Sequence, residues 1–475
     1  MKSEVSSLNK ELIIKNSSLF LLLLYGLLIT GVNIYFNSPY HDEALNIQMG
    51  HQILSKEACP GCAQNTGSVI VQPILAALGD RVAGIAGSRA IGILFSLSLT
   101  IIIFAASSTL IPRTQALFAA MIFLFSGPTL YLSTLATYDI VAAFFLGLSI
   151  VCILKARNAV KYSDNWLFSA AVALFFASIT KYVVAVYAPF LLAFVLLGRN
   201  RLRGLIAFVI PFLFLVSLYI MFALYPVLDT LRGSMLSVYT ESQVSGTQLA
   251  SWAFRWVAMP YLLAVFGMFH ASYGKTAVVF TVLSTPVILF HLLTGAEQSI
   301  NKNVIFSLVF LAPAAAIGID HLGNIFSFNA SMKWVKPFFI MVLFLVLWAF
   351  GFNQMRWLHG QYPDLAPVVE YFQHHGKDGM TVLLDSDYGD AVYSYTLGKI
   401  FPHAQFSSMA AYHSSRASAQ TIPDYIILDD YYTKKPYRLK ALSYIRESGY
   451  SLAKTFTLKL SWGEKSVSIY SRRIP

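Results

Sequence analysis

The chain has 475 residues, of which 56% are hydrophobic and only 12% are charged, and its mean hydropathy is +0.61. Soluble domains carry about 25% charged residues, so this composition excludes a large soluble protein and indicates a polytopic membrane protein. The net charge of +11 does not indicate nucleic-acid binding, because the basic residues cluster in short loops on alternate connections. This is the positive-inside pattern, and it predicts a cytoplasmic N-terminus.

The first apolar segment, residues 18–36, is long enough to cross a bilayer. The polar residues 1–16 before it are too many for a signal peptide, and no small-residue cleavage site follows, so we predict a retained first span. Ten further spans are predicted at 89–111, 115–132, 139–154, 166–180, 183–197, 204–225, 256–273, 276–293, 304–319 and 337–352. The expected fold class is a polytopic α-helical membrane protein with about 11 transmembrane helices.

Two regions lie outside these spans. Residues 37–88 form the first external loop of the membrane domain, which we take as residues 1–355. Beyond Arg356 the composition becomes polar, and short apolar strands alternate with helix-like stretches. Strands are predicted at 381–385, 425–429, 451–460 and 466–471, the last two as edge strands, with a helix at 439–448. Residues 356–475 are therefore expected to be a small α/β domain, which the topology places on the extracytoplasmic side.

Asp42 and Glu43 follow directly after the first span, at the membrane–water boundary. Charged groups near hydrocarbon are rare and usually functional. Adjacent residues point in different directions, so one acid can act on a substrate while the other orients a neighbour. The alternative is structural: Asp42 as the N-cap of a surface helix over residues 44–54, with Glu43 aiding the helix dipole.

Further charged residues are expected on the same outer face. Asp139 opens the fourth span, where it either shares acid–base work with Asp42 or caps a helix. Lys181 interrupts an apolar hairpin and is suited to neutralise a phosphate. Arg89, Arg255 and Lys302 complete a cationic set for an anionic leaving group, with interfacial snorkelling as the alternative. An acidic site could recruit Mg²⁺ or Mn²⁺, but the sequence shows no recognisable ligand set.

The three cysteines divide into a pair and a single residue. Cys59 and Cys62 form a Cys-Pro-Gly-Cys motif in the first external loop, which is compatible with a disulfide, a redox pair or half a zinc site. No second pair is present, which disfavours zinc. An oxidising periplasm favours a disulfide that braces the loop. Cys152 lies in an apolar segment and is expected to be a packing residue.

The acidic motif Asp42-Glu43-Ala44 resembles that of the GT-C glycosyltransferases that use polyprenyl-phosphate sugars. It is most similar to the group of protein mannosyltransferases and lipid A aminoarabinose transferases. The resemblance extends over roughly residues 18–320 and is carried in order by Thr66 to Arg89, Ala136-Thr137-Tyr138-Asp139, Ser178 to Tyr182, and Lys302-Asn303 followed by Ala312-Pro313. Two positions depart from it: Thr66-Gly67-Ser68 replaces His-Pro-Pro, and Thr137 replaces an arginine.

The resemblance implies an inverting transfer of a sugar from a polyprenyl monophosphate at the bacterial inner membrane. The acceptor, which is lipid A, a glycan or a protein, would approach from the periplasm. Asp42 would act as general base or as the acid that positions the acceptor, with help from Glu43 and Asp139, while the cationic residues Lys181, Arg255, Lys302 and Arg89 would bind the lipid phosphate.

Three other functions are left open. A transporter or flippase of lipid-linked sugars fits the spans and intramembrane charges, although no paired repeat is visible. A polymerase or ligase of lipid-linked glycans would also act in external loops. A scaffold for envelope partners would use mainly the C-terminal domain.

Overall fold

The computed structural model describes residues 2–56, 70–159, 163–197, 201–230, 244–297, 299–326, 334–385, 389–409, 422–432 and 435–472. The chain forms two compact units. The membrane unit comprises residues 1–34 and 52–355, and the α/β unit comprises residues 35–51 and 356–475. This division differs from the predicted domains at one place, since residues 35–51, which comprise the end of the first predicted span and the start of the first external loop, belong to the α/β unit.

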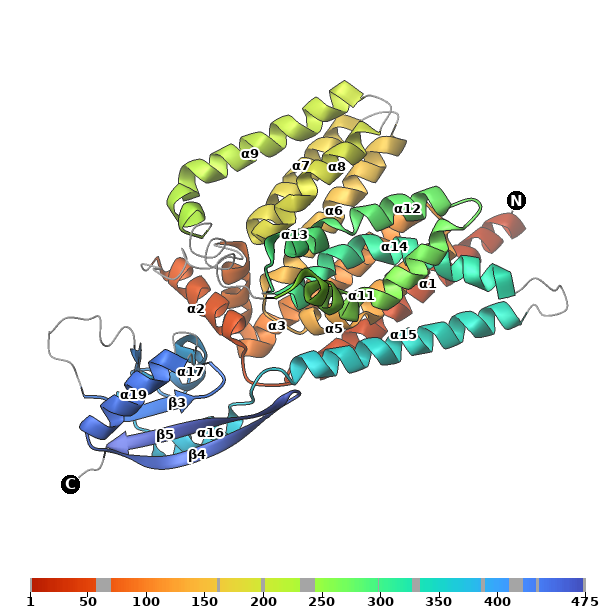
Figure 1. Cartoon of the computed structure of the whole chain (residues 1–475). Helices are drawn as coiled ribbons and strands as arrows, with labels where there is room; N and C mark the ends of the chain where they lie inside the picture. Colours follow the sequence, from red (N-terminus) through yellow and green to blue (C-terminus); the bar gives the residue numbers. More distant parts are fainter. Residues whose placement is uncertain are drawn as a thin grey trace. The chain divides into compact units, whose positions relative to one another are not determined.

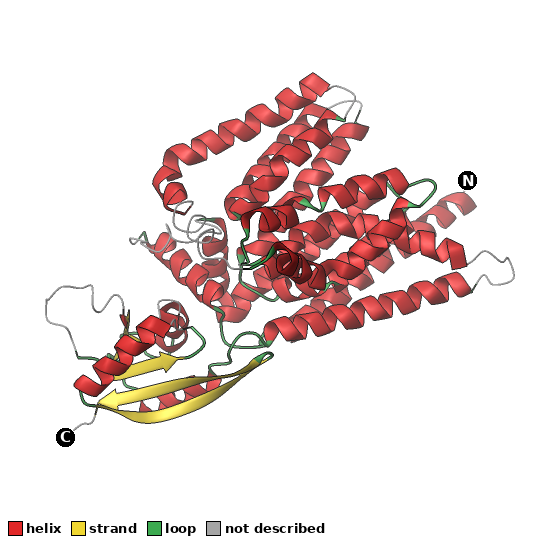
Figure 2. Cartoon of the chain, viewed as in Figure 1, coloured by secondary structure: helices red, strands yellow, loops and turns green. Residues whose placement is uncertain are grey.

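The membrane unit is helical throughout its described residues (Figures 1 and 2). Its helices are α1 (Lys2–Val32), α3 (Val71–Ser108), α4 (Arg113–Phe125), α5 (Gly127–Ser133), α6 (Tyr138–Asn158), α7 (Ser163–Thr180), the 3-10 helix η2 (Tyr182–Tyr187), α8 (Ala188–Leu196), α9 (Arg201–Thr230), α11 (Gly246–Met268), α12 (Gly274–Leu283), α13 (Pro286–Thr294), α14 (Ile300–Phe326) and α15 (Val335–His359).

Seven stretches of described helix are long and apolar enough to cross a membrane, or eight if the bent pair α4–α5 is one span. Two shorter apolar helices, residues 17–32 and 182–196, add to these. The protein is therefore a multi-pass membrane protein, but the predicted count of about 11 spans is not confirmed.

Breaks interrupt two of the predicted spans and the helix that leads into a third. Helix α3 begins well before the predicted residue 89 and is broken at Gly84, whose φ of 61° is readily adopted by glycine. Helices α4 and α5 meet at Ser126 at an angle of 63°, and Pro128 lies in the first turn of α5. The predicted span 276–293 consists of α12 and α13, and Pro286 begins the second of them. Proline fits the first turn of a helix because the N–H groups of that turn have no acceptor within the helix, so the missing N–H of proline costs no hydrogen bond.

Helix α14 is the central helix of the membrane unit. In the most apolar stretch of α14, 89% of the residues are buried, against 6% in α9. A methyl group added at Gly318 of α14 would lie 1.8 Å from the carbonyl oxygen of Leu263 in α11. The backbones of α11 and α14 therefore approach closely, as small residues allow in membrane proteins.

The α/β unit contains residues 41–51 of α2 (His41–Ser55), together with α16 (Ala366–His375), β1 (Thr381–Leu384), α17 (Gly389–Gly398), β2 (Gln405–Ser408), β3 (Tyr425–Asp429), α19 (Lys435–Glu447), β4 (Tyr450–Leu460) and β5 (Gly463–Arg472). The sheet order is β2-β1-β3-β5-β4; β1 pairs with β2 and β3 in parallel, while β5 is antiparallel to both neighbours. Its core is formed by Leu383, Met409, Ile426, Leu428, Ala441, Ile445 and Tyr450.

The prediction of two C-terminal edge strands is half wrong. Strand β4 is an edge strand, but β5 lies between β3 and β4 and pairs on both sides. Apolar and polar residues alternate along β5 because the strand has one face on the core and one in solvent. Such alternation does not depend on whether a strand lies at an edge. Helices α16 and α17 and strand β2 were not predicted.

Candidate active site

The two acids of the first external loop lie in the first turn of α2 and have different surroundings. Glu43 is fully buried, and its carboxylate Oε2 accepts a hydrogen bond from the backbone N–H of Tyr40 at 2.9 Å. Tyr40 also accepts the first helical hydrogen bond, from Ala44, so Tyr40 is the N-cap residue. A glutamate that reaches back to the N-cap N–H is half of a capping box.

Asp42 is half-buried and does not occupy the N-cap position considered for it from the sequence. Its backbone oxygen accepts a hydrogen bond from Asn46 Nδ2 at 2.7 Å. The capping bond is made by the Glu43 side chain, and the Asp42 carboxylate is the more exposed of the two acids. Glu43 is therefore the capping acid, and Asp42 is the more exposed acid of the pair.

In the membrane unit, Asp139 and Lys181 form an ion pair. The Asp139 side chain is fully buried and that of Lys181 is 7% exposed. Asp139 lies in the first turn of α6, and Lys181 stands between α7 and η2. From the sequence, Asp139 either shares acid–base work with Asp42 or caps a helix; in the structure it pairs with Lys181, and the N-cap residue of α6 is Thr137.

The Lys181 ammonium lies 5.0 Å from the ring centre of Tyr138 and 5.8 Å from that of Phe306. Aromatic faces attract cations at such distances, so the two rings help to hold the lysine in place. Around the ion pair, Asp139 Oδ2 and the hydroxyls of Thr137 and Thr180 are buried and have no hydrogen-bond partner among the described residues. Buried polar atoms without partners are costly, which is typical of a site completed by water or ligand.

A second buried lysine, Lys302, lies near the start of α14, on the same face of that helix as Phe306. Lys302 is 3% exposed, and Asn303 beside it is 5% exposed. Asn303 Nδ2 lies 2.8 Å from His291 Nε2, and His291 Nδ1 lies 2.6 Å from the carbonyl oxygen of Ala296. Because the carbonyl can only accept, Nδ1 carries the hydrogen, and Nε2 accepts from the asparagine.

This arrangement keeps His291 neutral and leaves Asn303 Oδ1 without a hydrogen-bond partner in the described parts of the chain. His291 was missed from the sequence. The signal that could have found it is an ionisable residue within an apolar segment, which is a candidate for function by default.

The two predicted arginines have different surroundings. Arg89 is fully buried in α3, and its Nη1 donates to the carbonyl oxygen of Ile34 at 2.8 Å. It therefore holds the backbone just beyond α1, where the first part of the membrane unit ends. Arg255 is exposed on α11, with its guanidinium 5.4 Å from the ring centre of Trp256.

No three His, Cys, Asp or Glu side chains of the described ranges come together as a ligand set. The expectation of Mg²⁺ or Mn²⁺ stays a prediction. Cys59 and Cys62 lie outside the described residues, and Cys152 is buried with a free thiol, as predicted for a packing residue.

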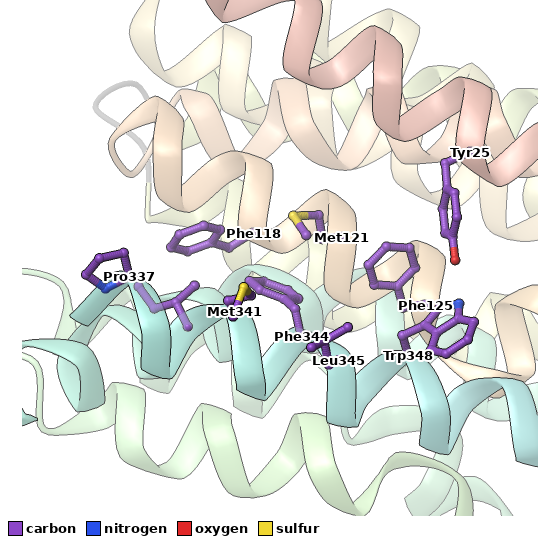
Figure 3. Close-up of a pocket in the computed structure, with 10 residues that line it drawn as sticks. Tyr25, Phe118, Met121, Phe125, Pro337, Met341, Phe344, Leu345 and Trp348 are labelled. Atoms are coloured by element: carbon purple, nitrogen blue, oxygen red, sulfur yellow. The ribbon is translucent and has the colours of Figure 1, made fainter. Parts of the chain in front are cut away.

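An apolar groove of 630 Å³ lies between α1, α4 and α15 (Figure 3). Rings and thioethers such as Phe118, Met121 and Phe344 line it, and none of its lining residues is charged. It shares no residue with the Asp139–Lys181 pair or with α2, so it does not belong to the candidate active site.

Comparison with known proteins identifies this fold. A model of the family "Dolichyl-phosphate-mannose-protein mannosyltransferase" matches residues 79–232. This range includes Arg89, Asp139 and Lys181. No curated protein sequence matches the chain.

Several solved structures resemble the whole chain. ArnT from Cupriavidus metallidurans, bound to undecaprenyl phosphate, is 11% identical with a TM-score of 0.61, covering 94% of this chain and 97% of ArnT. The archaeal oligosaccharyltransferase AglB from Archaeoglobus fulgidus, in complex with an inhibitory peptide and a dolichol-phosphate, is 10% identical with a TM-score of 0.55, covering 93% and 73%. Arabinofuranosyltransferase AftD from Mycobacteria is 12% identical with a TM-score of 0.56, covering 95% and 39%.

These similarities confirm the resemblance predicted from the sequence. The chain has the fold of the GT-C glycosyltransferases, a class of membrane enzymes that transfer sugars. At such low identities the solved structures establish the fold alone.

Proposed function

We propose that this protein transfers a sugar from a polyprenyl-phosphate donor to an acceptor on the periplasmic face of the bacterial inner membrane. The observation that carries the proposal is the division of the two acids on α2. Glu43 is buried in the helix cap, and Asp42 is left more exposed at the start of the helix. The capping role accounts for Glu43. The likeness of the fold to that of ArnT supports assigning the reaction to Asp42.

In the proposed reaction, Asp42 removes a proton from an acceptor hydroxyl, and the acceptor oxygen attacks the anomeric carbon of the donor sugar. A new carbon–oxygen bond forms on the face opposite the departing phosphate, so the configuration inverts. The bond between the anomeric carbon and the phosphate oxygen breaks, and its electron pair leaves with the polyprenyl phosphate. The proton on Asp42 is then lost to water. General base catalysis of this kind contributes about 10²–10⁴-fold in rate.

The departing phosphate gains negative charge, and we assign its binding to the buried cations of the membrane unit. Lys181 and Lys302 are both more than nine-tenths buried, and Asp139 neutralises one of them. A unit charge about 4 Å from another is worth about 4 kcal/mol at an effective dielectric constant of 20. The unpartnered hydroxyls of Thr137 and Thr180 are suitable donors to phosphate oxygens. Arg89 and Arg255 have no such role in this proposal.

The test uses purified protein in liposomes with undecaprenyl-phosphate sugars carrying labelled mannose, aminoarabinose or arabinofuranose, and envelope fractions as acceptors. Asp42→Asn is expected to lower kcat by about 10²–10⁴-fold while binding of undecaprenyl phosphate persists. Asp378→Asn, which changes an exposed acid of the same unit, serves as control. EDTA followed by Mg²⁺ or Mn²⁺ tests whether a cation takes part.

Transfer by Asp42→Asn within about twofold of wild type would contradict the proposed role of this acid. Movement of the labelled donor across acceptor-free liposomes, without any transfer, would favour the flippase alternative.

A further inference from the structure

The helix that carries Asp42 belongs to the C-terminal unit, although it lies between α1 and α3 in the sequence. Six of its residues are buried: Glu43, Ala44, Asn46, Ile47, Met49 and Gly50. Two sets of contacts connect this helix and its leading segment to residues more than 300 positions later, and a third set fixes a turn within the later residues.

The first set holds the segment before α2. Asn37 Nδ2 donates to the carbonyl oxygens of His359, at 3.0 Å, and Tyr362, at 2.9 Å. The Ser38 hydroxyl donates to the Asp364 carboxylate at 3.0 Å and accepts from the N–H of Leu365 at 2.9 Å. These four hydrogen bonds fix the chain immediately before Asp42.

Aromatic rings add to this attachment. Phe36 stacks on the His359 ring, with ring centres 3.7 Å apart and planes 9° apart. The Tyr40 ring lies 4.1 Å from that of Tyr362. The N-cap residue of α2 is thus held by both its backbone and its side chain.

The second set holds the middle of α2. Gln48 Nε2 donates to the Ser394 hydroxyl at 2.7 Å and to the carbonyl oxygen of Ala391 at 3.2 Å. The Ser394 hydroxyl in turn donates a hydrogen bond to the carbonyl oxygen of Asp390 at 2.5 Å. Gln48 is therefore bonded to α17, the helix that comes after β1 in the sequence.

The third set lies at the carboxyl end of β3. The Asp429 carboxylate accepts hydrogen bonds from the Tyr393 hydroxyl at 2.7 Å and from the backbone N–H groups of Tyr431, at 2.7 Å, and Tyr432, at 3.3 Å. This fixes the turn after the strand. Tyr432, in this turn, is buried.

From these contacts we propose that the C-terminal α/β unit positions Asp42 for the transfer, and that Gln48 and Ser394 are positioning residues. The proposal rests on the assignment of Asp42 as the base. Asp42 lies between the Asn37–Ser38 attachment and the Gln48 attachment, so loss of either lets the carboxylate move. A misplacement of about 1 Å can lower a rate by about 10²-fold.

The experiment compares Gln48→Ala, Ser394→Ala and the double variant in the full-length protein. Each single variant is expected to lower kcat about tenfold, with the donor KM unchanged, because the proposed donor site lies in the membrane unit. The double variant should be no worse than the worse single one, since both remove the same contact. Ser394→Thr, which keeps the hydroxyl, should restore the rate.

Thr455→Ala is the control, because it removes an exposed hydroxyl pair, Thr455 with Ser468, elsewhere in the same unit. Hydrogen exchange of residues 41–55 supplies a readout that does not depend on transfer. Faster exchange in Gln48→Ala and Ser394→Ala, but not in Thr455→Ala, is expected.

Unchanged exchange, or faster exchange with unchanged kcat, would overturn the positioning role. Failure of the wild-type protein to transfer any sugar would instead count against the proposed function, and the exchange data would still decide whether the Gln48–Ser394 contact holds α2.

Discussion

The buried ion pair of Asp139 and Lys181 gives a prediction that separates stability from catalysis. Asp139→Leu leaves a lysine buried without its counter-charge, because the pair is enclosed by the surrounding helices. Removing one partner of a buried pair costs about 3–5 kcal/mol, whereas replacing both with apolar residues of similar volume is often neutral. Asp139→Leu should therefore lower the free energy of unfolding by about 3–5 kcal/mol, and the double variant Asp139→Leu/Lys181→Met should recover most of it.

Catalysis should not recover in the same way. Lys181→Met removes a cation worth about 4 kcal/mol to a phosphate about 4 Å away, which corresponds to as much as about 10³-fold in rate. The double variant should therefore be nearly as stable as wild type but slow in transfer. Lys302 remains in both variants, so some activity should persist.

The assays are denaturant unfolding in mixed micelles and sugar transfer from undecaprenyl-phosphate donors. Arg203→Met is the control, because Arg203 pairs with Asp164 at the surface, with side chains 72% and 38% exposed. Surface pairs contribute about 0–1 kcal/mol, so this change should have little effect. A loss below about 1 kcal/mol in the free energy of unfolding of Asp139→Leu would contradict the burial of the ion pair. Transfer at the wild-type rate by the stable double variant would contradict the proposed role of the Lys181 charge.

Three further predictions concern packing, hydrogen bonding and pH. Gly351→Ala should markedly lower the thermal unfolding temperature, because the added methyl would lie 1.8 Å from a backbone oxygen of α4, whereas Gly31→Ala, with nothing within 4 Å, should not. Asn303→Leu should cost about 1–3 kcal/mol in the free energy of unfolding, because it leaves the buried His291 Nε2 without its donor. Burial raises the pKa of the Asp429 carboxyl, so the folded state holds this proton more tightly and the carboxyl lowers stability as pH rises above about 4. Asp429→Asn should remove that decline, as measured by unfolding between pH 4 and 7.

Each of these has a clear contrary outcome. Equal unfolding temperatures for the two glycine variants would contradict the close approach of α15 to α4. An Asn303→Leu protein as stable as wild type would show that another group satisfies His291. An unchanged slope of stability against pH in Asp429→Asn would show that other groups dominate this range.

Much of the fold could be predicted from hydrophobic patterning. The apolar runs located most membrane helices, and the runs before Asp385 and Asp429 located two buried strands. The breaks were missed, although Gly84, Pro128 and Pro286 mark them in the sequence, because an apolar run alone does not show whether a helix continues.

The sequence could identify which residues form the candidate site, but not which of them contact one another. Asp42, Glu43, Asp139 and Lys181 stand out as charges in or near apolar segments. The Asp139–Lys181 pair joins residues 42 positions apart, and Gln48 meets Ser394 across 346 positions. Such pairs depend on how helices pack, which local sequence does not contain.

The long sequence separation between α2 and α17, the helix to which Gln48 is bonded, also has a consequence during synthesis. Chains are made at about 5–20 residues per second, so α17 follows Gln48 out of the ribosome after about 17–70 s. For that interval α1 and α2 are present, but the residues that hold Gln48 do not yet exist. On the proposed function, Lys181 and Lys302 are made before Ser394, so the nascent chain holds its donor-binding lysines while its base remains unsupported until synthesis reaches the C-terminal unit.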